Sequence, residues 1–252
     1  MNPYRLLTVI GLVSATVLTG QTKAGDRRFT YSYEAVTAPK GCIEYEQWVT
    51  WKARRGDPGN KDQFDFRHEI EIGLTDRLQL GLYLSDWSVV SQNGSTEADW
   101  KKGAVEFIYN LTNPTTDLIG SALYGEVFLG DEVFGLEGKL ILQKNIGPWI
   151  AVYNATLEAK WEGSSYDEQV GEFKNSFGIS YQVSPQLSVG AELFTEVEFD
   201  DWGAAGDHAV YAGPNIAFRS GKFFATTTVL FQTTGIDSEP DVQTRLIFGF
   251  DF

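Results

Sequence analysis

Apolar and polar residues alternate along most of this chain with a period of two, and few folds accommodate such a pattern. It is clearest in residues 63–74, where Phe64, Phe66 and Ile70 alternate with Asp65 and Glu69. Successive side chains of a β-strand point to opposite faces, so this pattern predicts a strand with one apolar and one polar face. A helix would scatter both classes around its axis. The same alternation recurs in residues 42–54, 102–111, 149–161, 172–183, 187–199 and 242–252. The chain is therefore expected to be all-β.

The connections between these segments predict how the strands are joined. Short turn signals lie at residues 75–77, 145–148, 184–186 and 220–222, and they alternate with longer polar stretches at 55–62, 86–99, 162–170, 200–208 and 233–241. Short turns at one rim and longer loops at the other are typical of outer-membrane β-barrels. Counting the segments from Gly41 predicts an antiparallel up-and-down transmembrane β-barrel of about 12 strands, with 14 as an alternative.

The N-terminus predicts export from the cytoplasm. Arg5 precedes an apolar stretch at residues 6–18, and Thr22 and Ala24 are small residues placed for cleavage. The stretch is shorter than the 20 or so residues that a transmembrane helix needs, so residues 1–24 are expected to be a signal peptide. We expect residues 25–40 to be an extended segment in the lumen or at the periplasmic mouth, and residues 41–252 to be the barrel.

A membrane barrel is favoured over a soluble β-sandwich, which also alternates. The apolar face recurs on each of these strands, and aromatic residues such as Trp149 and Trp161 lie near strand ends, where they suit interfacial girdles. The last segment resembles the signal that the barrel-assembly machinery recognises, on the residues Leu246, Phe248, Phe250 and Phe252. The expected location is the Gram-negative outer membrane, reached through the periplasm, with membrane lipid, lipopolysaccharide and that machinery as partners.

A family resemblance supports this interpretation. It rests on residues 34–41, 44–48, 74–81 and 123–127. These segments resemble an uncharacterised group of Gram-negative outer-membrane β-barrels that is labelled transporter-like, near the phenol-degradation-pathway outer-membrane family. The resemblance implies the fold and the location. Transport is implied only by the label given to that group, because a fold does not determine a function.

The polar faces predict what the interior contains. If the apolar faces meet lipid, the candidate pore-lining residues are Glu44, Glu46, Arg67, Glu69, Glu71, Glu106, Glu126, Glu137, Lys139, Glu158, Lys160, Glu172, Lys174, Glu192, Glu196 and Arg245. Acids exceed bases in this set, which favours a passive channel for small polar or cationic solutes. The alternative is a closed structural or adhesive barrel with an ion-paired interior, because about 12 strands lies between the filled 8-stranded and the open 16-stranded barrels.

Several function classes are not supported by the sequence. With 34 Asp and Glu against 20 Lys and Arg, the chain should repel nucleic acid. His68 and His208 are the only histidines, and neither lies in a nucleophile–base pattern, so we expect no catalytic residues and no enzyme. An outer-membrane hydrolase using Asp200, Asp201 or Asp207 with His208 is the least favoured alternative. No zinc, EF-hand or phosphate-loop spacing is present, so no metal site or cofactor is predicted.

Overall fold

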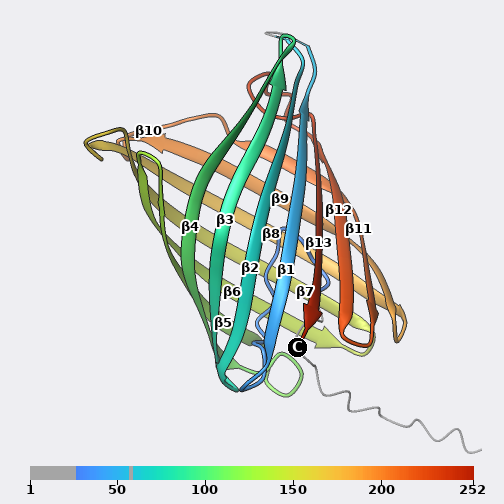
Figure 1. Ribbon diagram of the computed structural model, residues 1–252. Helices are drawn as coiled ribbons and strands as arrows, with labels where there is room; N and C mark the ends of the chain where they lie inside the picture. The colour runs from blue at the N-terminus through green and yellow to red at the C-terminus, as the bar shows by residue number, and fades with distance from the viewer. Residues whose placement is uncertain (1–26, 57–58) are drawn as a thin grey trace, which may run out of the picture.

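The computed structural model describes residues 27–56 and 59–252, and these residues form a closed β-barrel (Figure 1). The predicted signal peptide lies outside the described residues. Among the described residues, no helix is long and apolar enough to span a membrane. The strands are β1 (Ile43–Arg54), β2 (Lys61–Thr75), β3 (Leu78–Gln92), β4 (Ser95–Thr112), β5 (Gly120–Gly130), β6 (Val133–Ile146), β7 (Trp149–Glu162), β8 (Glu168–Ser184), β9 (Leu187–Asp200), β10 (Ala204–Ala205), β11 (Ala209–Ser220), β12 (Phe223–Gln232) and β13 (Val242–Asp251).

The wall of the barrel has the predicted up-and-down topology. Each strand pairs antiparallel with its neighbours in the chain, and β10 is a two-residue strand in the loop after β9. The other twelve strands make the wall, which confirms the predicted count. β13 closes the barrel by pairing along β1, from Asp251 opposite Glu44 to Val242 opposite Ala53. Closure removes the open sheet edges, whose unpaired backbone groups would be costly in hydrocarbon.

The predicted long loop at residues 86–99 is wrong. β3 continues to Gln92 and β4 begins at Ser95, so only Asn93 and Gly94 connect them. Both connecting residues have positive φ, 53° and 80°, as a tight hairpin turn requires. Residues 95–101 of β4 are exposed on both faces. Because this end of the hairpin contacts solvent on both sides, it carries no apolar stripe, and the sequence pattern looked like a loop.

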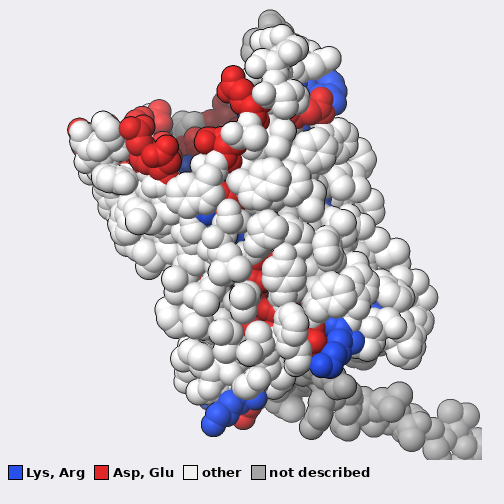
Figure 2. All heavy atoms as spheres, viewed as in Figure 1, with Lys and Arg blue, Asp and Glu red and all other residues white. Residues whose placement is uncertain are grey.

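The two faces of the wall differ as the alternation predicts. Phe64 on β2 is 40% exposed on the outside, whereas Glu69 on the same strand is 0% exposed in the interior. Figure 2 shows that most of the visible outer wall is uncharged and that acidic residues gather at the loop rim. An uncharged outer band over a polar interior is the arrangement that a lipid-facing barrel requires.

The C-terminal strand presents its aromatic residues outward. Phe250 and Phe252 are exposed and Phe248 is half-buried, and Leu246 shares their face. The backbone amide of Phe252 donates to the Ile43 carbonyl at 2.9 Å, so the last residue is tied to the first strand. Recognition of these residues by the assembly machinery stays a prediction.

Candidate functional site

The N-terminal segment, residues 27–40, runs through the barrel interior rather than along its wall. Figure 1 shows its blue trace behind β1 and β2. Thr30 and Ser32 of this segment are buried, although the segment is not part of the sheet. Buried backbone groups must find hydrogen-bond partners. Here the inward side chains of the wall supply them.

Glu192 on β9 makes the densest of these attachments. Its carboxylate accepts the backbone amides of Thr30, Tyr31 and Ser32 at 2.8, 2.9 and 2.8 Å. The Thr228 hydroxyl from β12 donates to the same carboxylate at 2.5 Å. Hydrogen bonds to an ionised acceptor are about twice as strong as neutral ones. Glu192 is therefore the main anchor of the segment on this side of the barrel.

Amide side chains hold the rest of the segment. Asn154 on β7 pairs with both backbone groups of Tyr33, accepting from its amide at 2.6 Å and donating to its carbonyl at 3.0 Å. Gln143 on β6 accepts from the Ala35 amide at 2.7 Å. Further bonds join Gln79 to Ala38, Asn110 to Ala35, Asn215 to Arg28, Thr226 to Arg27 and Arg245 to Thr30. The segment is thus fastened to most of the wall.

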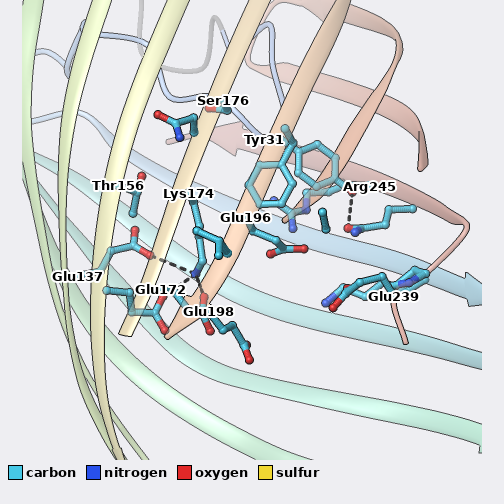
Figure 3. Close-up of a pocket in the computed structure, with 18 of the residues that line it drawn as sticks. Tyr31, Glu137, Thr156, Glu172, Lys174, Ser176, Glu196, Glu198, Glu239 and Arg245 are labelled. Carbon is cyan, nitrogen blue, oxygen red and sulfur yellow. Dashed lines mark hydrogen bonds and ion pairs between the residues drawn. The ribbon is translucent and has the colours of Figure 1, made fainter. Parts of the chain in front are cut away.

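Two interior spaces lie on either side of the segment. On the loop side is a vestibule of about 660 Å³, which is lined near the loop rim by Arg54, Lys61 and Glu239 and reaches inward to Tyr31 and Tyr33. Figure 3 shows Tyr31 and Glu239 at this vestibule. On the short-turn side is a cavity of about 80 Å³ that is lined by Glu44, Glu46 and Glu71. Tyr33 borders both spaces. A solute crossing the barrel would therefore have to pass the N-terminal segment.

A row of glutamates, interrupted at β3 by Gly81, rises along the inner wall. Each member lies directly opposite the next on the neighbouring strand. The row starts with Glu44 on β1 and Glu71 on β2, passes Gly81 on β3, and continues with one glutamate on each strand from β4 to β9. Because barrel strands are tilted and staggered, such a row rises around the wall instead of closing into a ring. It runs from the short-turn rim to the loop rim. We call it the glutamate spiral: Glu44, Glu71, Glu106, Glu126, Glu137, Glu158, Glu172 and Glu198.

Lysines balance the part of the spiral that faces the vestibule. Lys174 lies 2.7 Å from Glu158 and 2.5 Å from Glu172, and 3.9 Å from Glu137. Figure 3 shows Lys174 between Glu137 and Glu172. Lys139 pairs with Glu137 at 3.1 Å, Lys102 with Glu126 at 3.3 Å, and Lys160 with Glu172. Basic and acidic residues are equally numerous among those lining the vestibule. Toward the short-turn rim the spiral loses its lysines, and Arg27 bridges Glu46 and Glu71.

The structure places all of the predicted pore-lining residues on the interior side of the wall. Those most deeply buried are Glu44, Glu46, Glu69, Glu106 and Glu192. The roles of the wall amides Asn154 and Gln143 were not predicted, because an amide on a polar strand face gives no sign that it binds a segment far away in the chain. One available signal was chemical, since asparagine and glutamine both donate and accept and can replace a missing partner strand.

The two histidines lie apart from each other. His68 is on the outward face of β2, where its Nδ1 atom lies 2.9 Å from the Tyr45 hydroxyl and its Nε2 atom accepts from the Trp87 indole at 3.4 Å. His208 is exposed in the loop before β11. The acidic residues near His208 include Asp207, which borders the vestibule.

Comparisons with solved structures identify the fold. The COG4313 outer membrane channel from Pseudomonas putida F1 is similar with a TM-score of 0.65 and 12% identity, over 89% of this chain and 100% of that one. The NanC porin is similar with a TM-score of 0.54 and 8% identity, over 83% and 98%. The translocator domain of the autotransporter NalP from Neisseria meningitidis gives a TM-score of 0.50 and 11% identity, over 84% and 88%.

These similarities confirm the predicted fold, that of outer-membrane β-barrels, and this fold agrees with the predicted outer-membrane location. None of the curated proteins with which the sequence was compared matches it. One family model matches residues 21–246, which is most of the chain. The protein therefore belongs to the family of unknown function DUF6662.

Proposed function

We propose that the protein is a passive outer-membrane channel for small polar or cationic solutes, and that its N-terminal segment closes the lumen in the conformation described. The observation that carries the proposal is the glutamate spiral, which runs between the two rims. Rows of carboxylates are a common means by which channels favour cations. The COG4313 protein, whose fold is similar, is named an outer membrane channel.

The spiral is costly for a barrel that only has to be filled. Like charges directly opposite each other on neighbouring strands destabilise a sheet. Glu106 faces Glu126, Glu126 faces Glu137, and Glu137 faces Glu158. An interior selected only for stability would gain from alternating charges at these positions. A channel explains the repeated glutamates, because successive carboxylates would give cations successive binding positions along the lumen.

The closed barrel is the second candidate function, and one observation favours it. Wall side chains on many strands hydrogen-bond the N-terminal segment, and lysines pair with most of the spiral beside the vestibule. A structural or adhesive barrel needs no more than this. The two candidates differ in whether ions pass when the segment is loosened.

Ion selectivity tests the channel proposal. In planar bilayers under a KCl gradient, we expect the protein to give conductance steps with a cation-favouring reversal potential. Glu126→Gln should lower the cation-to-anion permeability ratio severalfold, because one unit charge at about 4 Å contributes about 1 kcal/mol even in water. The loss also leaves Lys102 without its partner at 3.3 Å, which favours anions.

Two comparisons complete this test. Glu132→Gln removes the same charge at the turn between β5 and β6 and should leave the ratio unchanged. The variant Glu192→Ala, which loosens the segment, should open more often than the unmodified protein. If neither the unmodified protein nor Glu192→Ala conducts ions or passes small solutes into liposomes, the channel is rejected in favour of the closed barrel.

A further inference from the structure

Three glutamates converge at the point where the spiral has no lysine. Glu69 and Glu71 are on β2, and Glu106 is on β4. Each presents a carboxylate oxygen to the others, and these oxygens all lie within 4.8 Å of one another. All three residues are buried, with exposures of 0%, 6% and 0%. The cluster therefore brings three acidic groups together inside the barrel.

Glu69 has no hydrogen-bond partner for either of its buried carboxylate oxygens. One oxygen of Glu106 also lacks a partner, while the Tyr83 hydroxyl donates to the other. A buried carboxylate without a partner costs several kcal/mol or more, so such groups normally pair with a cation or a donor. Glu69 thus points to a positively charged ligand between the three side chains.

The protein's own cations do not fill this position. Arg27 directs its Nε atom to Glu46 at 3.1 Å and its Nη2 atom to Glu71 at 3.4 Å. Within the described ranges, no lysine or arginine nitrogen lies within 4 Å of a carboxylate oxygen of Glu69 or Glu106. Arg67, which lies two residues before Glu69 on β2, pairs with Asp86 and not with the cluster. Arg27 therefore pairs with Glu46 and Glu71, and within the described residues no basic side chain pairs with Glu69 or Glu106.

The strand between the two glutamate pairs is adapted to this convergence. Gly81 of β3 lies directly between Glu71 and Glu106 in the sheet register. A Cβ atom at this position would lie 2.3 Å from the Cγ atom of Glu106. Only glycine lets the Glu106 side chain lie across β3 toward β2. A glutamate on β4 can therefore reach two glutamates on β2.

We propose that Glu69, Glu71 and Glu106 bind one divalent cation, and that this ion is Ca²⁺. Hard divalent cations prefer carboxylate oxygens, and Ca²⁺ binds its ligands at about 2.3–2.6 Å, so two of its ligands lie up to about 4.6–5.2 Å apart. The three oxygens lie within 4.8 Å of one another, which one such ion can bridge. Mg²⁺ usually keeps several of its waters and binds only one or two carboxylates, so three buried carboxylates favour Ca²⁺. The small cavity on the short-turn side reaches one of the three proposed ligands, Glu71. The proposal does not depend on ion conduction.

Calcium titration tests the site directly. The protein, refolded in detergent free of lipopolysaccharide and stripped with EDTA, is titrated with CaCl₂ by calorimetry, and its thermal unfolding is followed in parallel. We expect one bound Ca²⁺ per chain and a higher unfolding temperature with Ca²⁺ than with EDTA. Glu69→Gln should weaken binding by at least about tenfold, since even changes outside the ligand shell cost 10–100-fold in metal affinity.

Two further variants separate the site from general acidity. Glu198→Gln neutralises an exposed member of the same spiral at the loop rim and should leave Ca²⁺ affinity unchanged. Gly81→Ala keeps all of the carboxylates but displaces Glu106, so it should also weaken binding. If Glu69→Gln fails to fold, the Ca²⁺ affinity of Gly81→Ala tests the site in its place.

Three results would overturn the proposal. The first is that the unmodified protein binds no Ca²⁺. The second is that Glu69→Gln and Gly81→Ala bind Ca²⁺ as tightly as the unmodified protein. The third is that the Glu69→Gln variant is more stable than the unmodified protein by the same amount in EDTA and in Ca²⁺. This would show that the carboxylates share protons and bind no cation. Tighter binding of Mg²⁺ than of Ca²⁺ would overturn the assignment of the ion.

Discussion

Replacing Glu192 with alanine is expected to loosen the N-terminal segment and to lower the free energy of unfolding by at least about 3 kcal/mol. Its carboxylate accepts three consecutive backbone amides, of Thr30, Tyr31 and Ser32. Each buried donor left without a partner costs about 1–3 kcal/mol. The Thr228 hydroxyl loses its acceptor as well. Among the described residues, no other single side chain forms as many hydrogen bonds with the segment.

Two measurements check this expectation. Urea unfolding in detergent or lipid gives the loss of stability, and limited trypsin digestion reports the release of the segment by cleavage after Arg27 or Arg28. Glu196→Ala is the matched control, because Glu196 lies on the same strand and also borders the vestibule but makes no hydrogen bond to the segment. If Glu192→Ala and Glu196→Ala resist urea and trypsin equally, Glu192 is not the anchor.

Replacing the next residue, Leu193, with arginine is expected to destabilise the barrel for the opposite reason. Leu193 is the seventh of the 14 residues of β9 and is 40% exposed on the outer face. A charged arginine on the lipid face of a barrel costs about 2–4 kcal/mol at the bilayer midplane and about 0–1 kcal/mol near the interfaces. The side chain cannot reach water without distorting the surrounding lipid.

Unfolding in lipid vesicles measures this cost. Leu118→Arg is the control, because Leu118 is 92% exposed in the turn between β4 and β5 and should tolerate the same charge within about 1 kcal/mol. Equal stability of the Leu193→Arg and Leu118→Arg variants would contradict the placement of the β9 outer face in hydrocarbon.

The period of the sequence was enough to predict the two faces of the wall. Glu192 and Leu193 are neighbours in the chain, yet one is buried among polar groups and the other faces outward. Successive strand residues point to opposite sides, so a strict alternation determines which side chains meet lipid once the sheet closes. The strand count and the inward orientation of the predicted glutamates follow from this local rule.

The alternation failed where the environment is the same on both sides. Residues 95–101 have solvent on both faces, so the sequence there could not distinguish a strand from a loop. The N-terminal segment is a related case. Phe29, Tyr31 and Tyr33 alternate with polar residues as in a strand, but the backbone partners of the segment are side chains of distant strands, such as Asn154 and Glu192.

Which polar residues are neighbours could be learned only from the folded barrel. Glu71 and Glu106 are 35 positions apart in the chain and meet because Gly81 stands between them in the sheet. That register depends on turn lengths and on irregularities such as the shift opposite His68 and Glu69, where β3 advances from Ser85 to Tyr83. A slip of one residue would turn a whole strand over. The sequence determined the faces because their pattern is local, and the structure decided the glutamate spiral and the acidic cluster because cross-strand contacts are not.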